Sequence, residues 1–267
     1  MENFKIYLGL DISTVTIGIS VVKHINGEPN TNCEVVLLEG LVLKNKELNK
    51  MKGVEALFIK NKIFREKLLN IKELIKRTYQ RDIDEVVIEE PLFSSNNIVT
   101  CGVLMKFNGI ISNSIYEELG IVPEFISSYD SRCFAFPDLM AVHVFNKKNE
   151  RRDIKEIRKA LKNNHLVLFG NYGFQIDKKV VIQELVSEKF PNIDWLYNKN
   201  GELDKSSFDS SDALACILGY INKIQNNNEK PQIVDVDDTE KEIKYTTMLG
   251  DKKYQHIIRF NEYVYHP

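Results

Sequence analysis

The stretch KIYLGLDISTVTIGISVV, Lys5 to Val22, decides the fold of this chain. An apolar run leads into Asp11, small hydroxyl residues follow, and a second apolar run begins at Ile17. This pattern predicts a β-hairpin whose first strand ends in an acid. A third apolar run, Cys33 to Leu43, follows the turn signal NGEP and extends the hairpin to a three-stranded meander.

Beyond the meander, helix-type and strand-type periodicities alternate along the chain. The apolar residues of 54–79 keep a 3.6-residue period, whereas 85–90 is a short continuous apolar run of the type found in strands covered on both faces. Further elements are expected at 98–119 (helix), 121–127 (strand), 178–190 (helix) and 206–224 (helix). This order resembles that of RNase H-like proteins and predicts an α/β fold with a mixed five-stranded sheet flanked by helices.

Two segments do not belong to that minimal order. Residues 134–176 carry a basic helix and a short aromatic strand-like piece, and we interpret them as an insertion. After the run Asn226 to Asn228, residues 229–267 alternate apolar and polar positions around Leu249-Gly250-Asp251, which predicts a small C-terminal β appendage. The expected organisation is therefore one main domain, 1–225, and an appendage, 229–267.

Composition excludes several classes of protein. The hydrophobic content of 43% and charged content of 28% are those of an ordinary globular chain. No uninterrupted apolar run approaches the roughly 20 residues that cross a bilayer, and the N-terminus lacks a signal-peptide pattern, so we expect no membrane partner and a cytoplasmic location. The four cysteines form no C-x-x-C pair, which argues against disulfides and zinc.

Charge is distributed unevenly although the net charge is only −2. Lys44 to Arg81 contains twelve basic and four acidic residues, and Lys147 to Lys162 contains eight basic and three acidic ones. Basic stretches on either side of an acidic site suit a protein that binds phosphates. Solvated helix faces give the same pattern, so this alternative stays open.

Acids end two of the predicted central strands and recur on the last helix. Asp11 and Glu89 stand at strand ends, where α/β sheets gather their ligands, and Asp209 and Asp212 form a D-x-x-D pair at the start of an apolar helix. Oxygen ligands without histidine or thiolate favour Mg²⁺, with Mn²⁺ as a substitute. The set predicts a site for two ions about 4 Å apart, as in two-metal phosphodiester hydrolysis.

Two ambiguities remain at this site. Glu89 and Glu90 are adjacent in one strand and must face opposite sides, so only one can be a ligand; we favour Glu89. Asp209 and Asp212, if they lie in the first helical turn, also gain from the helix dipole, and without a metal they would simply cap the helix.

Three blocks of sequence resemble the RuvC-like Holliday-junction resolvases of the RNase H-like superfamily. They are LGLDISTVTIG at 8–18, VVIEEPLF at 86–93 and DSSDALA at 209–215. By position, the resemblance implies Asp11, Glu89, Asp209 and Asp212 as catalytic metal ligands. DKKVVIQELV at 177–186 resembles the family's lysine-bearing helix, which adds Lys179, or Lys178, as a phosphate contact.

The resemblance implies a Mg²⁺-dependent homodimer that resolves four-way DNA junctions by paired nicks, with the helix at about 98–116 in the dimer face. Further DNA contacts are expected from Ser13, Phe93, Asn96, Lys106 and Arg132, Phe93 by stacking on an unpaired base. The insertion and tail have no counterpart in compact bacterial enzymes and would suit a phage or mobile-element version acting in the host cytoplasm.

Three alternatives carry the same residues. A RuvC-like or YqgF-like nuclease could act on other branched DNA or on RNA. An actin-like ATPase also uses a D-x-S/T hairpin, but this chain lacks a second glycine-rich phosphate loop. A non-catalytic binding module is disfavoured because all four acids are present.

Overall fold

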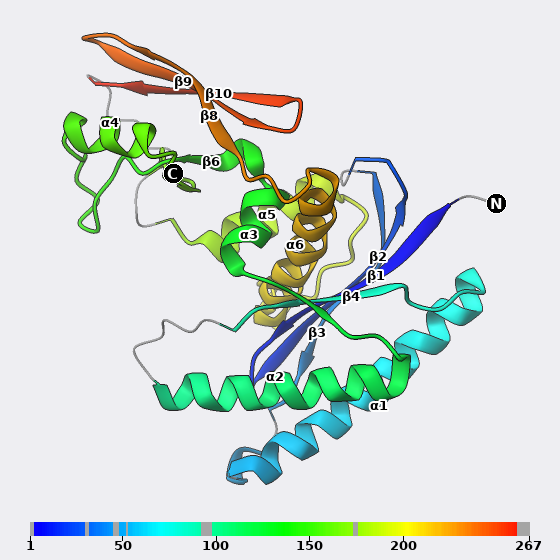
Figure 1. Ribbon diagram of the computed structural model, residues 1–267. Coiled ribbons are helices and arrows are strands. Elements are labelled where there is room, and N and C mark those ends of the chain that lie inside the picture. The colour runs from blue at the N-terminus through cyan, green and yellow to red at the C-terminus, as the bar shows by residue number, and fades with distance from the viewer. Residues whose placement is uncertain are drawn as a thin grey trace. The chain divides into compact units, whose positions relative to one another are not determined.

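The computed structural model describes residues 3–29, 32–44, 48–51, 53–91, 98–172 and 176–260. The chain divides into two compact units (Figure 1). The first unit comprises Met1–Ser131 and Lys179–Leu218, and the second unit comprises Arg132–Lys178 and Gly219–Pro267. The segments expected as a separate insertion and appendage thus fall into the same unit. Phe93 and Asn96 lie outside the described residues.

The first unit is built on a mixed five-stranded sheet of order β3-β2-β1-β4-β5, and this predicted sheet is confirmed. The first three strands form the antiparallel meander, and the other two run parallel to β1. Their bounds are Phe4–Ile12 (β1), Thr16–Ile25 (β2), Cys33–Val42 (β3), Glu85–Glu89 (β4) and Glu124–Ile126 (β5).

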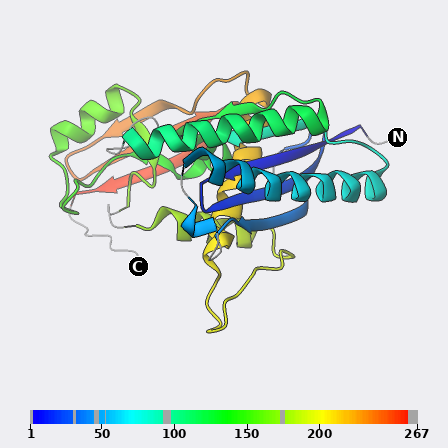
Figure 2. The same ribbon diagram turned by 90° about the horizontal axis from the view of Figure 1, so that it is seen from below.

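Two long helices cover one face of this sheet. They are α1 (Gly53–Tyr79) and α2 (Ile98–Leu119), and in Figure 2 both lie over the blue strands. The main hydrophobic core contains residues of both helices, such as Phe64 and Phe107, together with Leu8 and Leu10 of β1. Burial of these apolar faces is the main stabilising contribution to this layer.

The opposite face of the sheet meets α6 (Lys205–Gln225). Side chains alternate along β1, so that Gly9 and Asp11 face away from α1 and α2. A Cβ atom on Gly9 would lie 2.5 Å from the Ala213 carbonyl oxygen, and one on Gly18 would lie 2.0 Å from that of Asp209. Glycine therefore lets the backbone of α6 touch the strands. With both faces covered, Val87 and Ile88 of β4 are fully buried.

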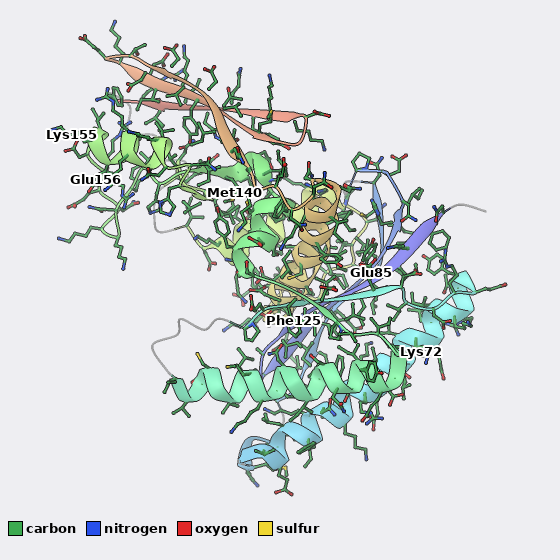
Figure 3. All side chains as sticks on the ribbon, in the orientation of Figure 1. Lys72, Glu85, Phe125, Met140, Lys155 and Glu156 are labelled. Atoms are coloured by element: carbon green, nitrogen blue, oxygen red, sulfur yellow. The ribbon has the colours of Figure 1, made fainter. Side chains whose placement is uncertain are left out.

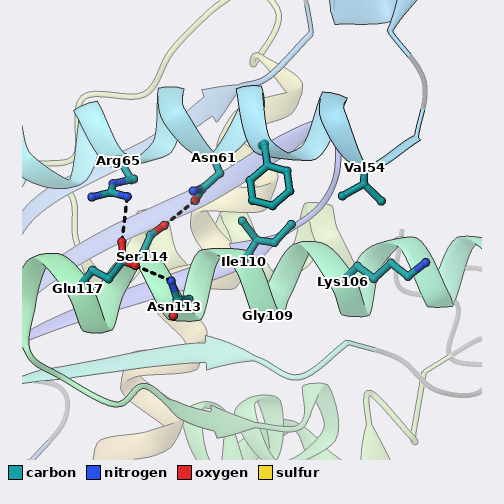
Figure 4. A pocket seen from close by; sticks show the side chains of 10 residues that line it. Val54, Asn61, Arg65, Lys106, Gly109, Ile110, Asn113, Ser114 and Glu117 are labelled. Atoms are coloured by element: carbon teal, nitrogen blue, oxygen red, sulfur yellow. Dashed lines mark hydrogen bonds and ion pairs between the residues drawn. The ribbon is translucent and has the colours of Figure 1, made fainter.

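The α1–α2 layer is joined by polar contacts as well as by the core (Figure 4). The Ser114 hydroxyl donates to Asn61 Oδ1 at 3.0 Å, and Arg65 binds Glu117 and Glu118. A groove of about 570 Å³ lies along the outer side of the two helices and includes Lys106 in its lining.

Helix α2 leaves much of its apolar surface uncovered. Ile98 is 85% and Val99 71% exposed. Among the described residues, α2 is the one helix long and apolar enough to cross a membrane by length and composition. Core helices of globular proteins meet the same criterion, so length and composition alone do not assign α2 to a membrane.

The second unit contains two small sheets and a basic helix. β6 (Met140–Val142) pairs with β7 (Leu166–Leu168), and α4 (Ile154–Lys162) contacts β6. The tail forms an antiparallel three-stranded sheet from β8 (Gln232–Asp238), β9 (Glu242–Leu249) and β10 (Lys252–Arg259). Lys155 and Glu156 are exposed on α4 (Figure 3). The expected β appendage is present, and Arg158 of α4 forms a bidentate ion pair with Asp238 of β8.

We predict that Gly18→Ala destabilises the protein by about 2 kcal/mol, because the new methyl group meets the backbone of Asp209, which cannot move aside as a flexible side chain would. Urea unfolding measures the effect. Gly102→Ala is the control, because a Cβ there meets nothing within 4 Å in mid-helix and should be neutral or stabilising. Equal unfolding midpoints for the two variants would contradict the close α6–sheet contact.

Candidate active site

Asp11 and Glu89 lie side by side on the α6 face of the sheet. The parallel register pairs Leu10 with Ile88, so the next residues along both strands are Asp11 and Glu89. Leu10 and Ile88 belong to the core under α1 and α2, and the alternation of side chains turns the two acids to the opposite face. The same alternation would turn Glu90, the residue after β4, to the other face.

Helix α6 brings Asp209 and Asp212 to the same face. Spacings of three and four residues put Asp209, Asp212 and Cys216 on one side of the helix. α6 begins at Lys205 and has no acid in its first turn, so the expected position of the pair at the helix start is wrong. The pair gains little from the helix dipole, which acts within the first turn. Its orientation comes from the packing of α6 on the glycine face.

Lys179, near the start of α5 (Lys178–Lys189), supplies the positive charge of the cluster. Its Nζ lies 2.8 Å from Asp209 Oδ1 and 3.5 Å from Asp212 Oδ2. Burial lowers the pKa of Lys179, but its hydrogen bond to Asp209 and the nearby carboxylates outweigh that effect and raise the pKa on balance. Lys179 therefore remains an ammonium ion at neutral pH.

The four carboxylates act on one another electrostatically. Burial raises the pKa of Asp11 well above its usual range, and the charges of Glu89, Asp212 and Asp209 raise it further, against the opposing effect of Lys179. Four acids and one lysine leave a surplus of negative charge. Such a surplus in a partly buried place attracts cations.

Cys216 distinguishes Glu89 from Glu90. Its thiol donates to Glu89 Oε2 at 3.9 Å, and the Ser131 hydroxyl donates to the Cys216 sulfur at 3.7 Å. Burial raises the pKa of the Cys216 thiol, which therefore stays protonated as a donor. These contacts hold Glu89 toward the cluster, whereas Glu90 is bound through its backbone amide, which donates to Ile126 O at 2.8 Å.

The residue types fit a hard divalent cation. All four candidate ligands offer carboxylate oxygen, and Lys179 relieves only part of the repulsion that the neighbouring carboxylates exert on Asp11. No three His, Cys, Asp or Glu side chains within the described ranges already converge to ligand spacing, and Lys179 bridges Asp209 and Asp212. The four acids therefore fit a divalent cation by the chemistry of their oxygen donors and by their negative charge, and not by a preformed ligand geometry.

The remaining predicted DNA contacts belong to different elements of the two units. The Ser13 hydroxyl accepts from the Thr16 amide at 3.0 Å and donates to Thr16 O at 2.7 Å, so it closes the turn after β1. Lys106 is exposed on α2. Arg132 and Lys178 belong to the second unit, where burial and the Arg132 charge lower the pKa of Lys178. Their role in DNA binding stays a prediction.

Several basic residues of the run around α1 are held in ion pairs. Besides Arg65, Lys67 binds Glu39 and Lys76 binds Asp82. Such surface pairs contribute little stability, but they reduce the charge available to phosphates. Residue counts alone therefore overstate the phosphate-binding capacity of this helix.

Sequence reasoning missed two residues that support the site. Cys216 follows Asp212 by one helical turn, a spacing that could have revealed it. Lys60 of α1 donates its Nζ to Thr14 O in the turn that follows Asp11. No local signal links Lys60 to this turn, because the contact joins residues 46 positions apart.

Neither a protein-family model nor a curated protein matches this sequence. Among solved structures, the chain is similar to Thermus thermophilus RuvC in complex with a Holliday junction substrate, with a TM-score of 0.46 and 12% identity over 85% of this chain and 98% of that one. Another T. thermophilus RuvC structure gives a TM-score of 0.45 and 13% identity over 84% and 98%. An Aquifex aeolicus member of the Ppx/GppA family gives 0.34 and 9% over 96% and 51%.

We predict that Asp11→Asn raises the thermal unfolding midpoint in EDTA by about 2–4 °C, corresponding to relief of about 1 kcal/mol of repulsion. The folded state binds the Asp11 proton more tightly than the unfolded chain does, so this carboxyl lowers stability as pH rises above about 4. The variant should lose that part of the pH dependence. Asp194→Asn, at an exposed position of the first unit, is the control and should leave the midpoint unchanged. A lower midpoint for Asp11→Asn would contradict the repulsion.

Proposed function

We propose that this chain is a metal-dependent endonuclease of the RuvC-like, RNase H-like type, which resolves four-way DNA junctions by paired symmetric nicks. The observation that carries the proposal is that Asp11, Glu89, Asp209 and Asp212, from three distant blocks of sequence, lie where α6 packs on the sheet, with Lys179 bound to both aspartates of α6 and Cys216 bound to Glu89. The same three blocks carry the resemblance to junction resolvases.

In the proposed reaction, Asp11, Glu89, Asp209 and Asp212 would hold two Mg²⁺ ions, or Mn²⁺ in their place. When bound, the ions would activate the attacking water and offset the charge that builds up on the phosphate. Glu89 is kept in position by Cys216, and Lys179 can turn its ammonium group from Asp209 toward a phosphate oxygen. The carboxylates repel phosphate when no cation offsets them, which makes cleavage depend on the metal.

The exposed apolar side of α2 supports a homodimer. A two-fold junction needs two sites related by two-fold symmetry, and an uncovered apolar stripe from Ile98 to Tyr116 is a surface that a second copy would bury. We propose this face for dimerisation.

Incubation with a synthetic four-way junction and Mg²⁺ tests the function. Two symmetric nicks on the junction, none on a matched linear duplex and none in EDTA are expected. Glu89→Gln should abolish nicking, and its neighbour Glu90→Gln should retain it, because only Glu89 faces the cluster. Asp11→Asn should still bind the junction, since it lessens the repulsion of phosphate.

Other outcomes would replace the proposal. Cutting of linear DNA or of RNA would indicate a RuvC-like or YqgF-like nuclease with another substrate. Nucleotide hydrolysis without nicking would indicate an actin-like ATPase, and junction binding without nicking at any metal concentration would indicate a binding module.

The dimer is tested by sedimentation velocity. Met105, 47% exposed on α2, is replaced in Met105→Glu, which should shift the protein toward a monomer because a carboxylate would be buried against the partner. Leu196→Glu, at a 53% exposed position outside α2, is the matched control. A wild-type protein that stays monomeric at all concentrations would overturn the dimer.

A further inference from the structure

The second unit contains a cleft of about 390 Å³ that the candidate active site does not use. It is lined by β10 on one side and by residues that flank β6 and β7 on the other. The phenyl and phenol rings of Phe145, Tyr172 and Phe260 contribute to it. The volume is near the lower end of the range for small-molecule sites, which suits one nucleoside-sized group.

The aromatic rings are held in place although they are accessible. Tyr172 is 39% exposed, yet its ring packs edge-on against Phe169 at 6.0 Å and its amide donates to Phe169 O at 3.0 Å. The Arg151 guanidinium lies 5.7 Å from the Phe260 ring centre and donates to Phe260 O at 3.0 Å. A fixed, exposed ring is a stacking platform that loses little entropy on binding.

Hydrogen-bonding groups of defined orientation share the cleft. The Tyr245 hydroxyl accepts from the Val142 amide at 3.1 Å, so its own hydrogen must go to Asn171, whose Oδ1 lies 2.9 Å away. Burial raises the pKa of Tyr245 to about 12, which keeps that hydrogen in place. Asn171 therefore presents its amide nitrogen, which has no acceptor among the residues that the structure describes. With the exposed Asp138 carboxylate, this gives a donor and an acceptor of the kind that read base edges.

A basic hairpin rises from the rim of the cleft. Phe145 and Arg151 pair across its base and both line the cleft, while Lys147 and Lys148 are exposed at its tip. The Asn146 side chain accepts from the Lys148 and Glu150 amides at 2.9 Å and stiffens the tip. Positive charge beside a stacking cleft complements a ligand with both bases and phosphates.

We propose that this cleft binds one nucleotide of a single-stranded nucleic acid. The base stacks on Tyr172, its edge meets Asn171 and Asp138, and the flanking phosphates lie along Lys147 and Lys148. A paired base offers no free face for such stacking, so single strands are preferred over duplex. The proposal requires no cleavage and stands apart from the proposed nuclease site.

Fluorescence anisotropy of the full chain with a labelled single-stranded DNA 12-mer in EDTA tests this inference, because no metal-dependent cutting interferes. Tyr172→Ala should weaken binding about tenfold, the usual effect of losing one base–aromatic stack. Tyr172→Phe keeps the ring and should bind as the wild type does. Tyr197→Ala removes a 63% exposed tyrosine of the first unit and should change nothing. Circular dichroism checks that each variant is folded.

The salt dependence separates phosphate binding from stacking. The logarithm of the association constant falls linearly with the logarithm of the salt concentration. Replacing Lys147 and Lys148 by alanine should make this slope less steep, by about 0.7 for each phosphate that is no longer neutralised. Tyr172→Ala should leave the slope unchanged. Equal affinities of wild type and Tyr172→Ala would overturn the proposal. So would equally tight binding of free dAMP, which would indicate a mononucleotide pocket, or stronger binding of a matched duplex. If the wild-type protein binds the 12-mer but does not nick four-way junctions, the proposed nuclease function fails and the proposed binding cleft stands.

Discussion

The contact between the backbone of α6 and the glycine face of the sheet is the constraint on which the candidate site depends. Gly9, Gly18 and Gly40 lie on three neighbouring strands, and a Cβ on any of them would come within 3 Å of α6 atoms. Only a helix this close can present Asp209 and Asp212 to Asp11. Substitution at these glycines therefore affects stability and the site together.

The cluster that this contact builds is costly to the fold. Burial and three neighbouring carboxylates oppose the ionised form of Asp11, and one lysine offsets only part of that repulsion. Acids with strongly perturbed pKa values are concentrated at functional sites. A destabilising cluster of this kind is therefore expected where its charge serves a function. The neutral contacts from Ser131 and Cys216 show how the fold orients Glu89 without adding another charge.

Positive charge has different uses in the two units. In the first unit, Arg65 and Lys67 of α1 are bound by acids of neighbouring elements, so these two basic residues join secondary structures. In the second unit, the tip residues Lys147 and Lys148 are exposed beside a cleft with fixed aromatic rings. A count of basic residues along the sequence does not distinguish these uses, because it does not show which basic side chains are paired with acids in the fold.

The sequence by itself determined the elements and their periodicity: the meander, α1, α2, the buried strand β4, the acids at the ends of β1 and β4, and the D-x-x-D pair on α6, although not the position of that pair within the helix. These follow from local hydrophobic patterns, which a linear sequence displays. The tertiary structure decided the rest. Strand register placed Glu89 beside Asp11 and Cys216 bound it there, ion pairs brought Lys179 to the aspartates, and the insertion and tail joined in one unit. Such choices depend on contacts between residues far apart in the chain, and no local periodicity encodes them.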